Sequence, residues 1–170
     1  MKEQKRLGNK GFSLVELIVV IAIMAILVAV LAPTLLSKIE ESREGTDYSA
    51  LGELKTATEE AVLGSETIYN LVKEDIGTSG TEKTYKVTID TTDNKISAIG
   101  ESTDKASAKL KDAVTKVLPE FEFKSDAAQG GEVYITVTKD GKVSAKIVAS
   151  GKTASDPAIT KKNEDPFEVK

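Results

Sequence analysis

An uncharged stretch near the start of the chain limits what it can fold into more than any other feature. Residues 17–37, between Glu16 and Lys38, are 21 consecutive uncharged residues, most of them Ile, Val, Leu or Ala. As a helix rising 1.5 Å per residue, such a stretch reaches about 30 Å, the thickness of a hydrocarbon core. A helix in a soluble core is rarely apolar on every side for that length. The sequence therefore predicts a membrane anchor over residues 12–36.

Charges on the two sides of the anchor predict its orientation. Residues 1–11 carry four basic side chains and one acidic one: Lys2, Lys5, Arg6, Lys10 and Glu3. Few basic residues closely follow the anchor, so the positive-inside rule places residues 1–11 in the cytoplasm and residues 38–170 outside an inner or cytoplasmic membrane. Without residues 1–11 the chain has 19 basic and 26 acidic side chains. This net negative charge does not predict the basic surface that binding to nucleic acid requires.

Composition argues against catalysis and metal binding. The chain has no Cys and no His, which removes disulfides, thiolate sites and the commonest general base. It also lacks the G-x-S-x-G, phosphate-loop and zinc-site spacings. The acidic segment Asp90–Asn94 is better explained as a turn, and Asp156, Glu164 and Asp165 as a solvated loop, than as calcium sites. We therefore predict no catalytic residue, no cofactor and no metal, and a protein that is not an enzyme.

The cleavage signal departs from that of an ordinary secreted protein. A secretory signal ends its apolar region with a small-residue cleavage site. Here the apolar region is too long, and Ala32-Pro33-Thr34 is a poor site. Lys10-Gly11 lies before the apolar region instead. A cut there would remove the charged leader, residues 1–11, and keep the anchor.

The segment Lys10-Gly11-Phe12-Ser13-Leu14-Val15-Glu16 with its apolar continuation resembles the class III signal of type IV pilins and their relatives. The match covers about 25 residues, from Lys10 to roughly Thr34. It combines a Gly, an apolar first mature residue, a small hydroxyl residue and a Glu at the fifth mature position. Many pilins close a C-terminal loop with a disulfide, and members without one are familiar in Gram-positive bacteria. The absence of Cys therefore favours the Gram-positive type.

The resemblance implies a role for each residue at the signal. A prepilin peptidase would cut after Gly11, and Phe12 would become the new, N-methylated N-terminus. Glu16 would pair with the amine of a neighbouring subunit's Phe12, so both residues would serve subunit assembly. Alternatively, Gly11 is an ordinary flexible residue, and Glu16 is a protonated or snorkelling residue at the membrane interface.

Pro33 predicts a kink late in the anchor, because proline removes a backbone donor and clashes with the preceding turn. In related filaments the segment before the matching proline loosens during assembly, often from a glycine. Ala25 stands near that place here. Loosening of residues 25–33 and a simple kink at the membrane surface both remain open.

Beyond the anchor, residues 37–64 are expected to continue the helix as an amphipathic half that ends at Gly64-Ser65. The apolar spacing of Ala50, Leu51, Leu54 and Ala57 marks its inner face, and the acidic residues are assigned to the polar face. A coiled coil is the competing interpretation, but clean heptads are too few.

Residues 65–150 are expected to form an extracytoplasmic domain. Residues 66–76 predict a short helix, and alternation around Tyr85 and at 95–99 predicts two strands. A helix over 104–118 comes next, with no predicted place in the fold. A hairpin around Asp140-Gly141 joins the last two predicted strands. The expected fold is α+β: a long N-terminal helix packed on an antiparallel sheet of about four strands. Residues 151–170 are expected to form a polar tail, held by packing or mobile.

These features predict a structural subunit that polymerises into a type IV pilus at the cell surface, for adhesion or twitching motility. Its implied partners are further copies of itself, minor pilins, the prepilin peptidase, the pilus assembly machinery and, before assembly, membrane lipid. One alternative is a pseudopilin of a type II secretion or DNA-uptake system. An alternative of another class is a monomeric, membrane-anchored binding module.

Overall fold

The computed structural model describes residues 12–90, 92–161 and 165–170. A long helix, α1 (Leu14–Leu63), precedes a region with two shorter helices, α2 (Glu66–Ile76) and α3 (Ser107–Val117), and the strands of a sheet. The chain divides into two compact units, one ending at Ile39 and one covering Glu40–Lys170, and α1 contributes to both. This is the α+β, pilin-like architecture that the sequence predicts.

α1 is a single helix of 50 residues that ends where the sequence predicts. The Gly64 N–H donates to the Glu60 carbonyl at 2.8 Å and closes the last turn. A Cβ at Gly64 would lie 2.7 Å from the same carbonyl oxygen. A side chain at this position would therefore collide with the backbone, which explains why the helix stops at a glycine.

The part of α1 in the first unit carries apolar side chains in all directions. Between Leu14 and Leu36 the large apolar side chains are 49–72% exposed, so the described residues leave each of them about half exposed or more. Among the described residues, α1 is the one helix long and apolar enough to cross a membrane. Pro33 lies within α1 without interrupting it. A kink at this residue stays a prediction.

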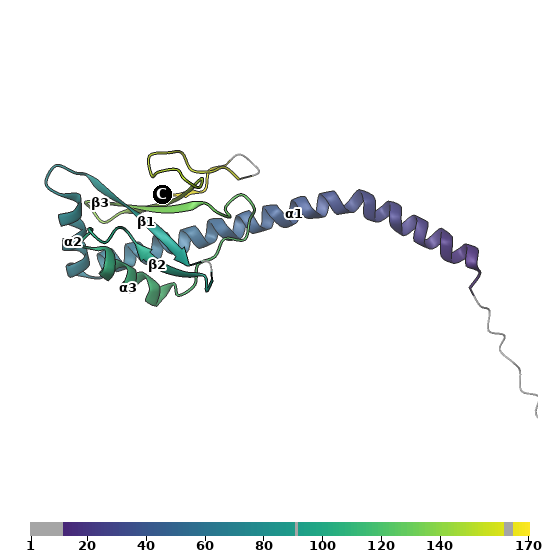
Figure 1. Cartoon of the computed structure of the whole chain (residues 1–170), viewed down its shortest axis with the longest axis horizontal. Coiled ribbons are helices and arrows are strands. Elements are labelled where there is room, and N and C mark those ends of the chain that lie inside the picture. Colours follow the sequence, from purple (N-terminus) through teal and green to yellow (C-terminus); the bar gives the residue numbers. More distant parts are fainter. Residues whose placement is uncertain (1–11, 91, 162–164) are drawn as a thin grey trace, which may run out of the picture. The chain divides into compact units, whose positions relative to one another are not determined.

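The second unit is built on an antiparallel sheet with the strand order β2-β1-β3-β4-β5 (Figure 1). The strands are β1 (Glu82–Asp90), β2 (Lys95–Ile99), β3 (Glu132–Thr138), β4 (Val143–Val148) and β5 (Glu168–Val169). Both predicted hairpins, β1–β2 and β3–β4, are confirmed. In the second turn Gly141 has φ +84°, and a Cβ there would lie 2.5 Å from Leu63 Cδ2. The positive φ of the turn therefore favours glycine at this position, and a side chain there would also displace the exposed Leu63 side chain.

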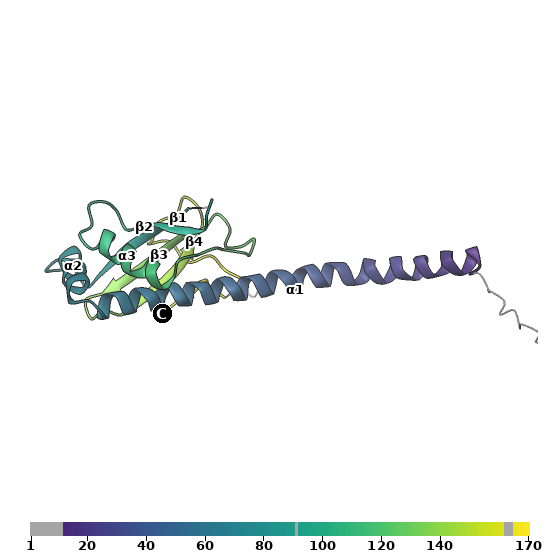
Figure 2. The same ribbon diagram turned by 90° about the horizontal axis from the view of Figure 1, so that it is seen from below.

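Alternation along the strands gives the sheet one apolar face. Tyr85, Ile135 and Ala145 lie opposite one another on β1, β3 and β4, and all three are buried. The three helices pack their buried residues against this face and complete the core. Figure 2 shows the second-unit part of α1 running along the strands. Their buried apolar residues include Leu51, Leu54 and Val62 of α1, Val72 of α2 and Leu110 of α3.

The structure places α3, which the sequence predicts without a position. The helix packs along the edge strand β2, and the Ser107 hydroxyl donates to the Ile99 carbonyl. Asp75 of α2 accepts hydrogen bonds from the Lys105 and Ala106 N–H groups at 2.8 and 3.0 Å. α3 is thus fixed by an acidic residue from α2 and by a hydroxyl on the sheet edge.

The C-terminal segment adds a strand to the four expected from the sequence. β5 pairs with β4, and Phe167 just before it is fully buried. Ile147 of β4 donates its N–H to the Phe167 carbonyl and accepts a bond from the Ile159 N–H, at 3.0 and 2.9 Å. The sequence left open whether residues 151–170 are held by packing or are mobile. At Ile159 and at Phe167–Val169, this segment is held against the sheet.

Two acidic residues of α1 point inward, although the sequence places them on the polar face. Glu44 is 4% exposed and Asp47 is fully buried. Asp47 accepts the N–H groups of Lys124 and Ser125, each at 2.8 Å, and the Ser125 hydroxyl at 2.5 Å. The prediction is wrong at both positions, and at Asp47 the reason is that a distant loop supplies the donors that a buried carboxylate needs.

Candidate functional site

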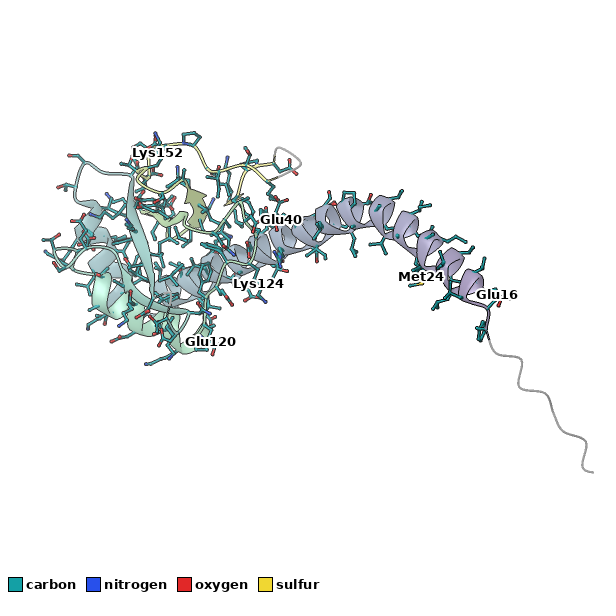
Figure 3. The ribbon with its side chains drawn as sticks, turned by 45° about the vertical axis from the view of Figure 1, so that its right-hand side comes forward. Glu16, Met24, Glu40, Glu120, Lys124 and Lys152 are labelled. Carbon is teal, nitrogen blue, oxygen red and sulfur yellow. The ribbon has the colours of Figure 1, made fainter. Side chains whose placement is uncertain are left out.

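The candidate site lies at the beginning of α1, where the sequence predicts processing and assembly. Gly11 and the rest of the 1–11 leader lie outside the described residues. Phe12 is 94% exposed and, like Ser13, precedes the helix, which begins at Leu14. Glu16 follows in the first turn, and Figure 3 labels its side chain there. Phe12 and Glu16 thus lie close in sequence, on either side of the helix start.

Ser13 and Glu16 form a capping box. The Ser13 Oγ accepts the Val15 N–H at 3.3 Å, and the Ser13 N–H donates to Glu16 Oε2 at 2.8 Å. The first turn of a helix leaves backbone N–H groups without partners, and these bonds satisfy two of them reciprocally. The sequence-based prediction did not include this box. Its signal was present as Ser-x-x-Glu directly before the apolar run.

Glu16 is an acidic side chain with apolar neighbours. Together with Phe12, Leu17 and Val20 it lines a shallow hollow on the surface of the first unit. Among the described residues, no basic side chain forms an ion pair with it. The helix N-terminus attracts negative charge, so Glu16 is favourable for α1 itself. In an apolar medium its carboxylate still has capacity for a cation.

Comparisons with known proteins agree with this geometry. The family described as "Prokaryotic N-terminal methylation motif" matches residues 6–32. The chain is also 38% identical over 89 residues to the type IV major fimbrial protein FimA of Dichelobacter nodosus. Its amino-terminal segment is thus similar to that of a type IV pilin. The alignment covers 47% of this chain and 56% of FimA, so the chain spans little more than half of that relative.

No solved structure matches this chain significantly. Its Gram-positive assignment remains a prediction. These similarities point to a structural subunit, and they fit a membrane-anchored precursor that becomes part of a surface pilus.

The acidic segments considered for calcium serve local turns. Asp90 accepts the Thr92 N–H at 2.8 Å, and this bond lowers the pKa of its carboxyl. Asp156 accepts the Thr153 N–H and hydroxyl, which lower the pKa of its carboxyl likewise. Glu164 lies outside the described residues. Within the described part of the chain, no group of acidic residues is arranged to hold a metal ion.

Proposed function

We propose that this chain is a pilin that a prepilin peptidase cuts after Gly11 and N-methylates at Phe12, and that the mature subunit polymerises into a type IV pilus. The observation that carries the proposal is an uncovered apolar helix with one acidic residue, Glu16, at its start. The match to the N-terminal methylation motif over residues 6–32 supports it independently.

The geometry around the proposed scissile bond supports cleavage before the helix. Phe12 and Ser13 are non-helical, and the capping box makes Leu14 the first helical residue. A peptidase must bind an accessible backbone, and α1 begins only at Leu14, two residues after Phe12. Cleavage there removes the basic leader and creates an amine on Phe12.

That amine would supply a cationic partner, which no described residue gives Glu16. An unpaired carboxylate costs about 3 kcal/mol at the centre of a bilayer and less near its surface. In a filament core of low dielectric, an amine from a second subunit attracts the carboxylate strongly, and an unpaired charge is costly. Pairing of Glu16 with the Phe12 amine of another copy would thus fix the register of each docking subunit.

The same helix would serve two stages. Before assembly, residues 12–36 would lie in the cytoplasmic membrane, with the leader in the cytoplasm and residues 38–170 outside. After cleavage, the apolar side chains between Leu14 and Leu36 would exchange lipid for neighbouring subunits. Their exposure in the single chain fits both stages, because an isolated subunit offers them no cover. The second unit would then lie on the pilus surface, where minor pilins and the assembly machinery contact it.

Mass spectrometry of filaments sheared from the cell surface tests the proposal. We expect a chain that begins with N-methylated Phe12 and is abundant in the filament. The Glu16→Ala variant should be cleaved normally but should give few or no filaments. A surface protein that begins at Met1, or normal filaments from Glu16→Ala, would contradict the proposal. Processed chain confined to short filaments of a secretion system would favour a pseudopilin instead.

A further inference from the structure

We propose that Ser13 is a positioning residue for Glu16: the capping box between them fixes the Glu16 carboxylate at the helix start before a second subunit docks. This inference rests on the proposed function, because it concerns how Glu16 meets the amine of another copy of the chain. It assigns a task to Ser13, which the proposed function leaves without one.

Three hydrogen bonds converge on Ser13. Its N–H donates to Glu16 Oε2 at 2.8 Å, its Oγ accepts the Val15 N–H at 3.3 Å, and its carbonyl accepts the Leu17 N–H at 3.2 Å. The first bond holds the Glu16 side chain, and the other two hold Ser13 on the first turn of α1. The position of the carboxylate is therefore tied to the backbone of its own helix.

The capping bond leaves room for a second partner. A carboxylate has two oxygens with about four acceptor positions, and the Ser13 N–H occupies one position on Oε2. An ammonium group of a docking subunit brings three donors and can bind the remaining positions. Glu16 is exposed in the single subunit, so the approach is open. The box and the amine therefore bind the same carboxylate together rather than compete for it.

The expected gain is preorganisation. A free Glu side chain loses rotamer freedom when it is fixed in a contact, and a side chain that is already held loses less. Only part of that freedom is removed by one hydrogen bond. We therefore expect loss of the box to weaken each docking step roughly three- to tenfold.

The test uses the full-length chain, expressed with its prepilin peptidase. Ser13→Ala removes the Oγ half of the box, and Glu16→Asp keeps the charge but shortens the side chain by one methylene. Ser13→Thr keeps a capping hydroxyl and should behave like the natural chain. Thr34→Ala, which removes a hydroxyl far along the same helix, is the matched control. Filament yield is normalised to the amount of chain that begins at Phe12, so that altered cleavage does not count as altered assembly.

Two readouts separate positioning from a purely structural role. Amide hydrogen exchange of the micelle-bound mature chain should accelerate at residues 13 and 15 in Ser13→Ala and stay unchanged in Ser13→Thr and Thr34→Ala. Filament yield should fall about three- to tenfold in Ser13→Ala and Glu16→Asp and be restored in Ser13→Thr.

Two results for Ser13→Ala would overturn the role of Ser13. One is faster amide exchange with an undiminished filament yield, and the other is unchanged amide exchange. If Glu16→Ala still fails to assemble in that case, the proposed function stands without it. Normal filaments from Glu16→Ala would instead contradict the proposed function itself.

Discussion

Replacing Asp47 with Ala should destabilise the second unit more than any exposed acidic substitution on the same helix. Asp47 is fully buried and binds the loop that follows α3 through the Lys124 N–H, the Ser125 N–H and the Ser125 hydroxyl. Alanine cannot accept any of these bonds. The substitution would leave the two N–H groups without their partner, one of them in a buried position.

The magnitude follows from the donors that would lose their acceptor. A hydrogen bond to a charged group contributes about 1.5–3 kcal/mol, and an unsatisfied buried donor costs about 1–3 kcal/mol. The Ser125 hydroxyl can rotate to another acceptor, so we count the two backbone N–H groups. Relief from burying the Asp47 charge offsets part of the loss. The net cost is about 3 kcal/mol, which for a unit of this size corresponds to roughly 10 °C in Tm.

The assay is thermal unfolding of the full-length chain in detergent micelles, followed by circular dichroism. Glu53→Ala is the matched control, because Glu53 is an exposed carboxylate on the same helix. It should change the free energy of unfolding by no more than about 0.5 kcal/mol. Equal Tm values for Asp47→Ala and Glu53→Ala would refute the account of Asp47 as the acceptor that fixes the 124–125 loop.

Two further predictions concern ionisation and glycine. Burial, together with the hydrogen bond from its hydroxyl to Glu132, raises the pKa of Tyr134 to about 12 from an ordinary value of 10.0. Since the folded state holds this proton more tightly, its contribution to stability is complete below about pH 10 and is lost as the pH rises through about 12. An ultraviolet titration should show this late step, and Tyr134→Phe should remove it. Gly52→Ala should stabilise α1 by about 0.5–1 kcal/mol, because a Cβ there meets nothing within 4 Å. Gly141→Ala should destabilise the fold, and denaturant unfolding that gave both variants the same sign would contradict these assignments.

Local pattern was enough to predict most elements of the fold. The end of α1 at Gly64, the α2 segment and both hairpins depend on glycines, polar turns and alternating residues that are adjacent in sequence. The predicted 104–118 helix was correct in kind but three residues early at its start. Its place beside β2 could not be predicted, because Asp75 and Ile99, which hold its first residues, have no pattern that marks them as partners.

Distant partners explain the errors. Asp47 was assigned to the polar face because charged residues on an amphipathic helix usually face water. Its partner Lys124 lies 77 residues away, and no local periodicity reveals that contact. Phe167 is an isolated aromatic in a polar segment, so its full burial was not visible either. At the candidate site, by contrast, the Ser13–Glu16 box is local and could have been found from its spacing.

Three acidic residues of α1 lie in different settings, and the donors around each one explain its place. Glu53 is exposed and solvated by water. Asp47 is buried, and three donors from one loop satisfy its carboxylate. Among the described residues, Glu16 has one donor from its own helix start and apolar neighbours otherwise, so these leave its carboxylate only partly satisfied once water is excluded. A site that is complete within the subunit would give no reason for assembly to depend on Glu16. We therefore expect a second subunit's amine to supply the further donors that the Glu16 carboxylate needs. Asp47 shows the contrasting case on the same helix, because its donors already lie within the subunit.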